Sequence, residues 1–172
     1  MTTERMFLAV APPADVIQMI ADLPTKALRG VRYTKRSQWH ITIKFLGKTD
    51  TSAALMALSH LEASAANVTL GPAVSLLGKR VVMLPASGLD GLALAAASAF
   101  AGVGEPQPDR QFNGHLTLAR LKGAPLRDPS LVSVLGAPIS ATFRATSLVL
   151  VKTELSQEAV TYTAVAERPL AI

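Results

Sequence analysis

The feature that most constrains this chain is a four-residue pattern that occurs twice, as HITI at 40–43 and as HLTL at 115–118. Each copy reads His-apolar-Thr-apolar, which is the period of two that a β-strand imposes on its side chains. His and Thr therefore share one face of each strand, and the aliphatic side chains share the other. Two of the chain's three histidines occupy these equivalent settings. The pattern predicts two similar strands, each with an imidazole and a hydroxyl on its polar face.

A single His-x-Thr strand is most often just the polar face of a half-buried strand, so it is the repetition that favours a function. If the two strands face each other across a cleft, two imidazoles and two hydroxyls converge. One neutral imidazole can then accept a proton while the other, as an imidazolium, protonates a leaving oxygen. The hydroxyls can donate hydrogen bonds to phosphoryl oxygens. We therefore predict that His40 and His115 are catalytic and that Thr42 and Thr117 bind a phosphate.

The charge balance favours an anionic partner. Lys and Arg number 17 against 12 Asp and Glu, which gives a net charge of +5. The chain has no cysteine, which excludes disulfides and thiolate metal sites. No acidic side chain or third histidine has an evident place beside either motif, so we expect neither a metal nor another cofactor. Several of the basic residues gather around the first motif: Arg29, Arg32, Lys35, Arg36 and Lys44.

The remaining chain alternates short strands and helices, within one domain of 172 residues. Strands are predicted at 6–11, 31–33, 39–46, 68–77, 81–84, from Phe112 to Gly123, and as a final pair at 141–152 and 159–167. Helices are predicted at 14–28, 52–66, 89–100 and 128–135, with Pro24 shortening or distorting the end of the first. The order predicts an α+β fold with largely antiparallel sheets. We expect residues 1–172 to form two similar lobes, each contributing one His-x-Thr strand.

Two segments resemble a known family. HITIKFLG at 40–47 and HLTLAR at 115–120 are similar to the paired motifs of the 2H phosphoesterases, and most similar to those of the bacterial and archaeal RNA 2′,3′-cyclic phosphodiesterases, also called 2′-5′ RNA ligases. The opening RMFLAVAPP at 5–13 resembles the first strand of that family, and Trp39 also fits. The resemblance spans most of the chain. It implies a bilobal, pseudo-twofold fold with a central cleft and outer helices.

The resemblance also implies an activity, namely metal-free opening of a terminal 2′,3′-cyclic phosphate to a 2′-phosphate. Some members join or cleave 2′-5′ linkages in RNA. It implies that His40 donates a proton to the ribose 3′ oxygen and that His115 activates water. Arg120 matches a residue that grips the phosphate, and Phe45 matches a position that stacks on a base.

Strict alternation complicates two of these positions. It places Phe45 and Arg120 on the faces opposite their histidines, so each needs a β-bulge or a strand end to turn inward. Core packing is an equal alternative for Phe45. Alternation puts Lys44 on the His40 face, so we predict that Lys44 binds substrate, and that Lys35 and Arg36 help to hold an RNA strand, with ordinary solvated charge as the equal alternative.

The expected partners are RNA ends or nucleotides that carry a 2′,3′-cyclic phosphate. Every long apolar stretch is interrupted by charge, Pro or Gly, and no signal peptide is evident, so we expect no membrane contact and a cytoplasmic monomer. His60 is predicted to be a solvated helix residue. The alternative function is a module of the same fold that binds RNA ends or nucleotides with little turnover.

Overall fold

The computed structural model describes residues 2–172 and contains ten strands and four α-helices. The strands are β1 (Thr3–Val10), β2 (Val31–Tyr33), β3 (Ile41–Asp50), β4 (Ala66–Leu70), β5 (Ser75–Leu77), β6 (Val81–Ser87), β7 (His115–Leu121), β8 (Ala141–Ala145), β9 (Ser147–Leu155) and β10 (Val160–Pro169). The helices are α1 (Ala14–Ala21), α2 (Thr51–His60), α3 (Asp90–Ala99) and α4 (Ala124–Arg127), with short 3₁₀ turns η1 (Arg36–Gln38) and η2 (Pro129–Leu131).

The strands follow one path in the order β10-β9-β1-β3-β7-β6-β4-β8, with β2 beside β7 and β5 beside β6. The pairings between these strands are antiparallel, which confirms the predicted α+β class. The path has a β3 half (β10, β9, β1, β3) and a β7 half (β7, β6, β4, β8 with β2 and β5). The halves join at a single residue pair, Ile41 with Leu116. The two expected sheets are therefore linked rather than separate.

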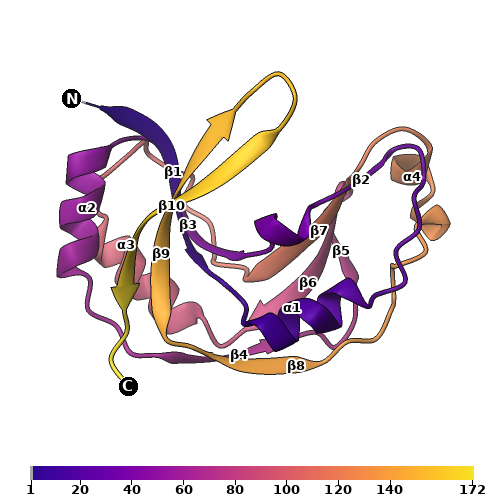
Figure 1. The fold of residues 1–172 in the computed structure, drawn as a ribbon, viewed down its shortest axis with the longest axis horizontal. Coiled ribbons are helices and arrows are strands. Elements are labelled where there is room, and N and C mark those ends of the chain that lie inside the picture. The colour runs from indigo at the N-terminus through magenta and orange to yellow at the C-terminus, as the bar shows by residue number, and fades with distance from the viewer. Residues whose placement is uncertain (1) are drawn as a thin grey trace.

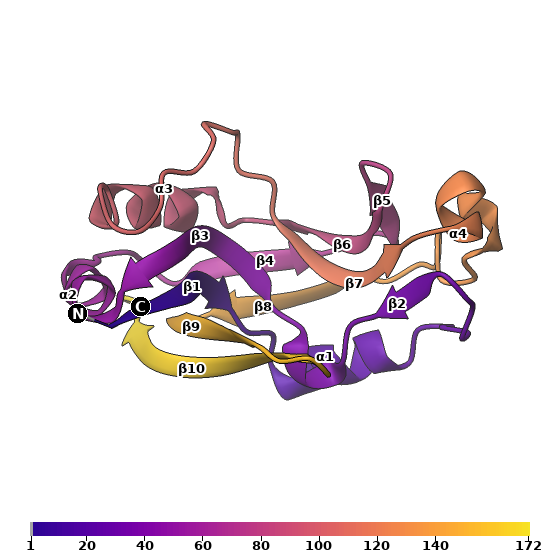
Figure 2. The same ribbon diagram turned by 90° about the horizontal axis from the view of Figure 1, so that it is seen from above.

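The two halves are not consecutive stretches of sequence. The final hairpin, β9–β10, pairs with β1 in the β3 half, while β4 and β6 belong to the β7 half. The helices also cross over: α1 follows β1 but contacts β8, and α3 follows β6 but contacts β3. In Figure 1 the β9–β10 hairpin projects away from the rest of the sheet, and Figure 2 shows α2 and α3 at the opposite end of the molecule from α4. This exchange of elements ties the two halves into one unit.

The aliphatic residues of both motifs form part of the buried core. Ile41 and Leu116 are completely buried, and Ile43 and Leu118 are nearly so. Burial of one such side chain stabilises a fold by about 1.5–3 kcal/mol, so the core fixes which face of each motif strand points inward. His40, Thr42, His115 and Thr117 are consequently left on the opposite, polar face.

Several boundaries differ from the sequence-based predictions. Helix α1 ends at Ala21 instead of residue 28, because Pro24 cannot continue a helix. The strand expected at 68–77 is divided into β4 and β5 around Gly71, whose φ of 111° interrupts a strand. The strand expected at 141–152 breaks at Thr146, where the chain passes from β8 in the β7 half to β9 in the β3 half. Helix α2 ends at His60, and residues 128–135 form only the turn η2.

Between residues 2 and 172, no helix has the length and apolar character needed to cross a membrane.

Candidate active site

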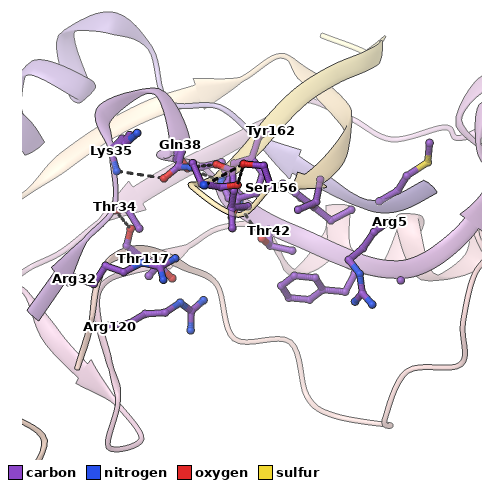
Figure 3. Close-up of a pocket in the computed structure, with 18 of the residues that line it drawn as sticks. Arg5, Arg32, Thr34, Lys35, Gln38, Thr42, Thr117, Arg120, Ser156 and Tyr162 are labelled. Atoms are coloured by element: carbon purple, nitrogen blue, oxygen red, sulfur yellow. Dashed lines mark hydrogen bonds between the residues drawn. The ribbon is translucent and has the colours of Figure 1, made fainter. Parts of the chain in front are cut away.

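The polar faces of β3 and β7 open into one cleft with a volume of about 830 Å³. The cleft is lined by His40, which directly precedes β3, by Thr42 of β3, and by His115 and Thr117 of β7. Figure 3 shows Thr42 and Thr117 on facing sides of this cleft, with Tyr162 and Ser156 of the β9–β10 hairpin above them. The structure therefore brings the two sequence motifs to a single site.

The two histidine rings are oriented in the same way. Nδ1 of His40 lies 2.7 Å from the carbonyl oxygen of Gln38, and Nδ1 of His115 lies 2.9 Å from that of Asn113. In both motifs the acceptor is the residue two positions earlier. Because a carbonyl oxygen can only accept a hydrogen bond, Nδ1 carries the proton in each ring. Each Nε2 is thereby left as the nitrogen that can exchange a proton with a substrate.

The Thr42 hydroxyl contacts the reactive nitrogen of its own motif. Its Oγ1 lies 3.0 Å from Nε2 of His40, and the hydroxyl donates to that nitrogen when the imidazole is neutral. A phosphate oxygen that enters the cleft can accept a hydrogen bond from the same hydroxyl. Thr42 is therefore positioned to hold His40 in the empty cleft and a phosphoryl oxygen in the occupied one.

Aromatic side chains enclose His40. The Phe7 ring stacks on it with centroids 4.7 Å apart, and the Tyr162 ring meets it edge-on at 5.3 Å. Burial in this environment lowers the pKa of His40, because it disfavours the charged imidazolium. The Gln38 carbonyl opposes this by raising the pKa, and the nearby positive charge of His115 lowers it further. The two imidazoles are thus close enough for the charge of His115 to act on His40.

This coupling predicts a measurable change. His40 is expected to titrate below the usual histidine pKa of about 6.5. In the His115→Ala variant its pKa is expected to rise, because the like charge is gone. Titration of the imidazole proton resonances by NMR checks both values, and the exposed His60 on α2 is the control resonance. A wild-type His40 pKa at or above the usual value, or no rise in the variant, would contradict this account of the site.

Bulges turn Phe45 and Arg120 toward the cleft. Ile43 and Leu46 of β3 have no partner in the pairing with β1, and Leu118 of β7 has none in the pairing with β6. Each bulge shifts the alternation of side chains by one position. Phe45 and Arg120 are accordingly exposed and line the cleft, so Phe45 is not a core residue.

The same bulge makes the expectation for Lys44 wrong. Lys44 was predicted to share the His40 face, but it is not among the described residues that line the cleft. The shift at Ile43 gives that place to Phe45. Of the other two basic residues, Lys35 lines the cleft, whereas Arg36 donates from Nη2 to Oε1 of Gln18 on α1 at 3.2 Å and does not.

Several cleft residues were not predicted as part of the site. Arg5, Phe7 and Tyr162 come from β1 and β10, strands that the sequence did not connect with either motif. Arg32 was counted only among the basic residues near the first motif, but β2 carries it to the strand of the second motif. The side chain of Gln38 donates to the Val160 carbonyl at 2.7 Å and so attaches the β10 strand to the turn before His40. These placements depend on long-range pairing, and no local pattern marks them.

The third histidine is separate from the site, as predicted. His60 is exposed at the end of α2, where its Nδ1 donates to the Met56 carbonyl at 2.9 Å. Among residues 2–172, no group of three or more His, Cys, Asp or Glu side chains is arranged to hold a metal ion. The cleft is lined by imidazole, hydroxyl and guanidinium groups, and two carboxylates, those of Glu105 and Glu158, also lie on its wall.

A sheet with two His-x-Thr strands facing one cleft defines a 2H phosphoesterase. The family model of the 2′-5′ RNA ligase superfamily matches residues 10–157, and the chain belongs to this superfamily. The resemblance of the two motifs is thereby confirmed at the level of the family. No match was found among curated protein sequences.

Solved structures share the fold over nearly the whole chain. A crystal structure described as a phosphoesterase is 24% identical, covering 99% of this chain and 100% of its own, with a TM-score of 0.80. Escherichia coli LigT complexed with 3′-AMP is 25% identical, with coverages of 98% and 99% and a TM-score of 0.77. The Thermus thermophilus protein TT0787 is 23% identical, with coverages of 96% and 97% and a TM-score of 0.77. LigT has also been crystallised with NADP+ and with ATP.

Proposed function

We propose that this protein is a metal-independent RNA 2′,3′-cyclic phosphodiesterase that hydrolyses a terminal cyclic phosphate to a 2′-phosphate. One observation carries the proposal. Each motif histidine donates from Nδ1 to its own i−2 carbonyl, which leaves both Nε2 atoms for one cleft that also contains the motif threonines. This is the arrangement that paired proton transfer at a phosphodiester requires.

The cyclic phosphate would lie between the two motifs. The hydroxyls of Thr42 and Thr117 and the guanidinium of Arg120 hold its non-bridging oxygens and stabilise the charge that develops there. One imidazole takes a proton from water at Nε2 as the water oxygen bonds to phosphorus. The other gives its proton to the ribose 3′ oxygen as the bond from phosphorus to that oxygen breaks. The product is a 2′-phosphate with a free 3′-hydroxyl, and proton exchange with solvent restores both rings.

We assign the acid to His40 and the base to His115, as the family resemblance implies. The lowered pKa of His40 favours its neutral form before substrate binds. The negative charge of a bound phosphodiester raises the pKa of a neighbouring imidazole, so substrate binding would favour protonation of His40.

The expected substrate is an RNA end or a nucleotide. Phe45 is 61% exposed at the cleft, which suits stacking on a base. The LigT complexes with 3′-AMP, ATP and NADP+ show that a structure of this fold accepts nucleotides. Attack by the 5′-hydroxyl of a second RNA in place of water would give a 2′-5′ linkage, so the same residues would support ligation.

The proposal predicts hydrolysis that is resistant to chelation. An oligonucleotide with a 2′,3′-cyclic phosphate end is incubated with protein that has been treated with excess chelator, and the position of the phosphate in the product is identified. The expected product carries a 2′-phosphate, at a rate that chelation does not change, because imidazole, hydroxyl and guanidinium groups supply the charge stabilisation.

Activity that disappears with chelator and returns with a divalent ion would overturn the metal-independent mechanism. Tight binding of the oligonucleotide without turnover would instead support the alternative, a module that only binds RNA ends. A product with a 3′-phosphate would mean that the ribose 2′ oxygen, and not the 3′ oxygen, is the leaving group.

A further inference from the structure

Two arginines face each other at one end of the cleft. Arg32 on β2 stands directly opposite Arg120 on β7 in the antiparallel register, and both side chains are exposed and line the cleft. Like charges in directly opposite positions destabilise a pair of strands. Within residues 2–172 neither arginine forms an ion pair with an acidic side chain. The structure thus keeps two unneutralised guanidinium groups together in a place where a bound anion would offset their repulsion.

The strand that carries Arg32 is held firmly in this register. The backbone N–H of Thr34 donates to the Leu118 carbonyl at 2.8 Å, and the Thr34 hydroxyl lies 2.9 Å from the carbonyl oxygen of Thr117. At the other end of β2, the backbone N–H of Lys122 donates to the Gly30 carbonyl at 2.8 Å. Trp39 donates from Nε1 to the Thr34 hydroxyl at 3.1 Å and so links this region to the first motif. The opposition of the two arginines is therefore built into the fold.

The arginine pair lies at the opposite end of the cleft from Phe45. Phe45 and Arg120 each stand five residues after the histidine of their own motif. Because β3 and β7 run antiparallel from the Ile41–Leu116 pair, they carry these two side chains in opposite directions. Figure 3 shows Arg32 and Arg120 on the same side of the cleft near Thr117, with Arg5 across from them.

The geometry of a ribose matches this layout. The base leaves the ring at C1′ and the 5′ carbon leaves it at C4′, on opposite sides of the edge formed by C2′ and C3′. A nucleotide with its cyclic phosphate between the two motifs and its base on Phe45 would therefore direct its 5′ carbon toward Arg32. Guanidinium groups bind phosphate oxygens strongly, commonly through two parallel hydrogen bonds.

We propose that Arg32 forms a second phosphate subsite, which binds the phosphate on the 5′ carbon of the terminal nucleotide, beside the Arg120 guanidinium that contacts the cyclic phosphate. In an RNA end this group is the internucleotide phosphate. The inference rests on the proposed function for the orientation of the nucleotide. It makes the protein selective for RNA ends over mononucleoside cyclic phosphates.

Binding of two stable ligands tests the subsite without turnover. Adenosine 2′-monophosphate and adenosine 2′,5′-bisphosphate are titrated by calorimetry into the wild type and into the Arg32→Gln variant. The wild type is expected to bind the bisphosphate about tenfold more tightly, and Arg32→Gln is expected to lose most of that advantage. The matched control is Arg29→Gln, which removes the same charge from an exposed residue that does not line the cleft. This variant should still bind the bisphosphate about tenfold more tightly than the monophosphate.

Turnover then identifies the source of the second phosphate. For Arg32→Gln, kcat/KM is expected to fall about tenfold more for a dinucleotide with a cyclic phosphate end than for adenosine 2′,3′-cyclic phosphate, mainly through KM. An effect on the bisphosphate but not on the dinucleotide would overturn the internucleotide assignment. Equal affinities of the wild type for both ligands, or equal losses in Arg32→Gln and Arg29→Gln, would overturn the subsite itself.

A third variant locates the site. If Arg5→Gln removed the bisphosphate advantage and Arg32→Gln did not, the second phosphate would lie at the Phe45 end and the proposal would be wrong. Failure of the subsite leaves the proposed function standing as long as cyclic phosphate is still hydrolysed. A bisphosphate advantage that depends on Arg32 supports the subsite even if no hydrolysis is found.

Discussion

Replacing either His40 or His115 with Ala is expected to lower the turnover of a 2′,3′-cyclic phosphate by about 10²–10⁴-fold, because each variant removes one of two proton transfers. The threonine hydroxyls and Arg120 remain in both variants and should still bind the phosphate. The loss is therefore expected mainly in kcat, with a smaller change in KM. Steady-state kinetics on a cyclic-phosphate oligonucleotide measures both parameters.

The third histidine provides a matched control. His60→Ala removes an imidazole from the exposed end of α2 and should leave turnover unchanged. Thermal unfolding of all three variants separates a catalytic loss from a folding defect, which matters most for His40 because it packs on Phe7 and Tyr162. The double variant should be little worse than the more damaged single one, since residues that act as a unit are not additive. Near-normal turnover by either single variant would exclude a two-histidine mechanism.

The central part of the site could be predicted from the sequence because it depends on local alternation. In both motifs the apolar residues are buried and the His and Thr side chains face the cleft. The period of two then fails within three residues of Thr42 and Thr117. The bulges that cause the failure arise from the pairing of β3 with β1 and of β7 with β6. The motif strands themselves carry no sign of them: alternation alone favours Lys44, and only the family resemblance indicated Phe45 and Arg120.

The rest of the site depends on contacts between distant segments. Tyr162 reaches His40 because the chain crosses from β8 to β9 at Thr146 and its last hairpin joins β1. Arg32 faces Arg120 because β2 pairs with the strand of the second motif, although the sequence places it next to the first. Neither pairing has a local signal in the chain. The element types were therefore predictable, but the exchange of strands between the two halves was not.

The environment of His40 also could not be predicted. In the sequence, Lys44 and Arg120 are the charged residues that follow the two motifs most closely. In the structure, burial beneath Phe7 and Tyr162 is the main cause of the lowered pKa of His40, and His115 itself is the charge that acts on it. The two rings share the Nδ1 hydrogen bond to the i−2 carbonyl, but only His40 has its Nε2 bonded to a threonine and its ring packed between Phe7 and Tyr162. This difference is the physical basis of the division into acid and base that we propose.

A substrate with sulfur in place of the ribose 3′ oxygen is expected to restore most of the activity lost in His40→Ala, and little of that lost in His115→Ala. A thiolate is a far weaker base than an alkoxide and leaves without protonation, so removal of the acid no longer limits the reaction. The base is still needed, because with either substrate the attacking water must give up a proton to it. The rescue should approach the full 10²–10⁴-fold loss that the oxygen substrate shows.

Rates for both substrates are compared among the wild type, His40→Ala and His115→Ala, with metal ions removed so that no thiophilic ion assists the departing sulfur. The wild type should gain little from the sulfur substrate, because its acid already protonates the oxygen. Rescue of His115→Ala alone would reverse the assignment and make His40, the ring whose pKa is lowered by burial, the base that activates water. Rescue of both variants, or of neither, would contradict a division of acid and base between the two histidines.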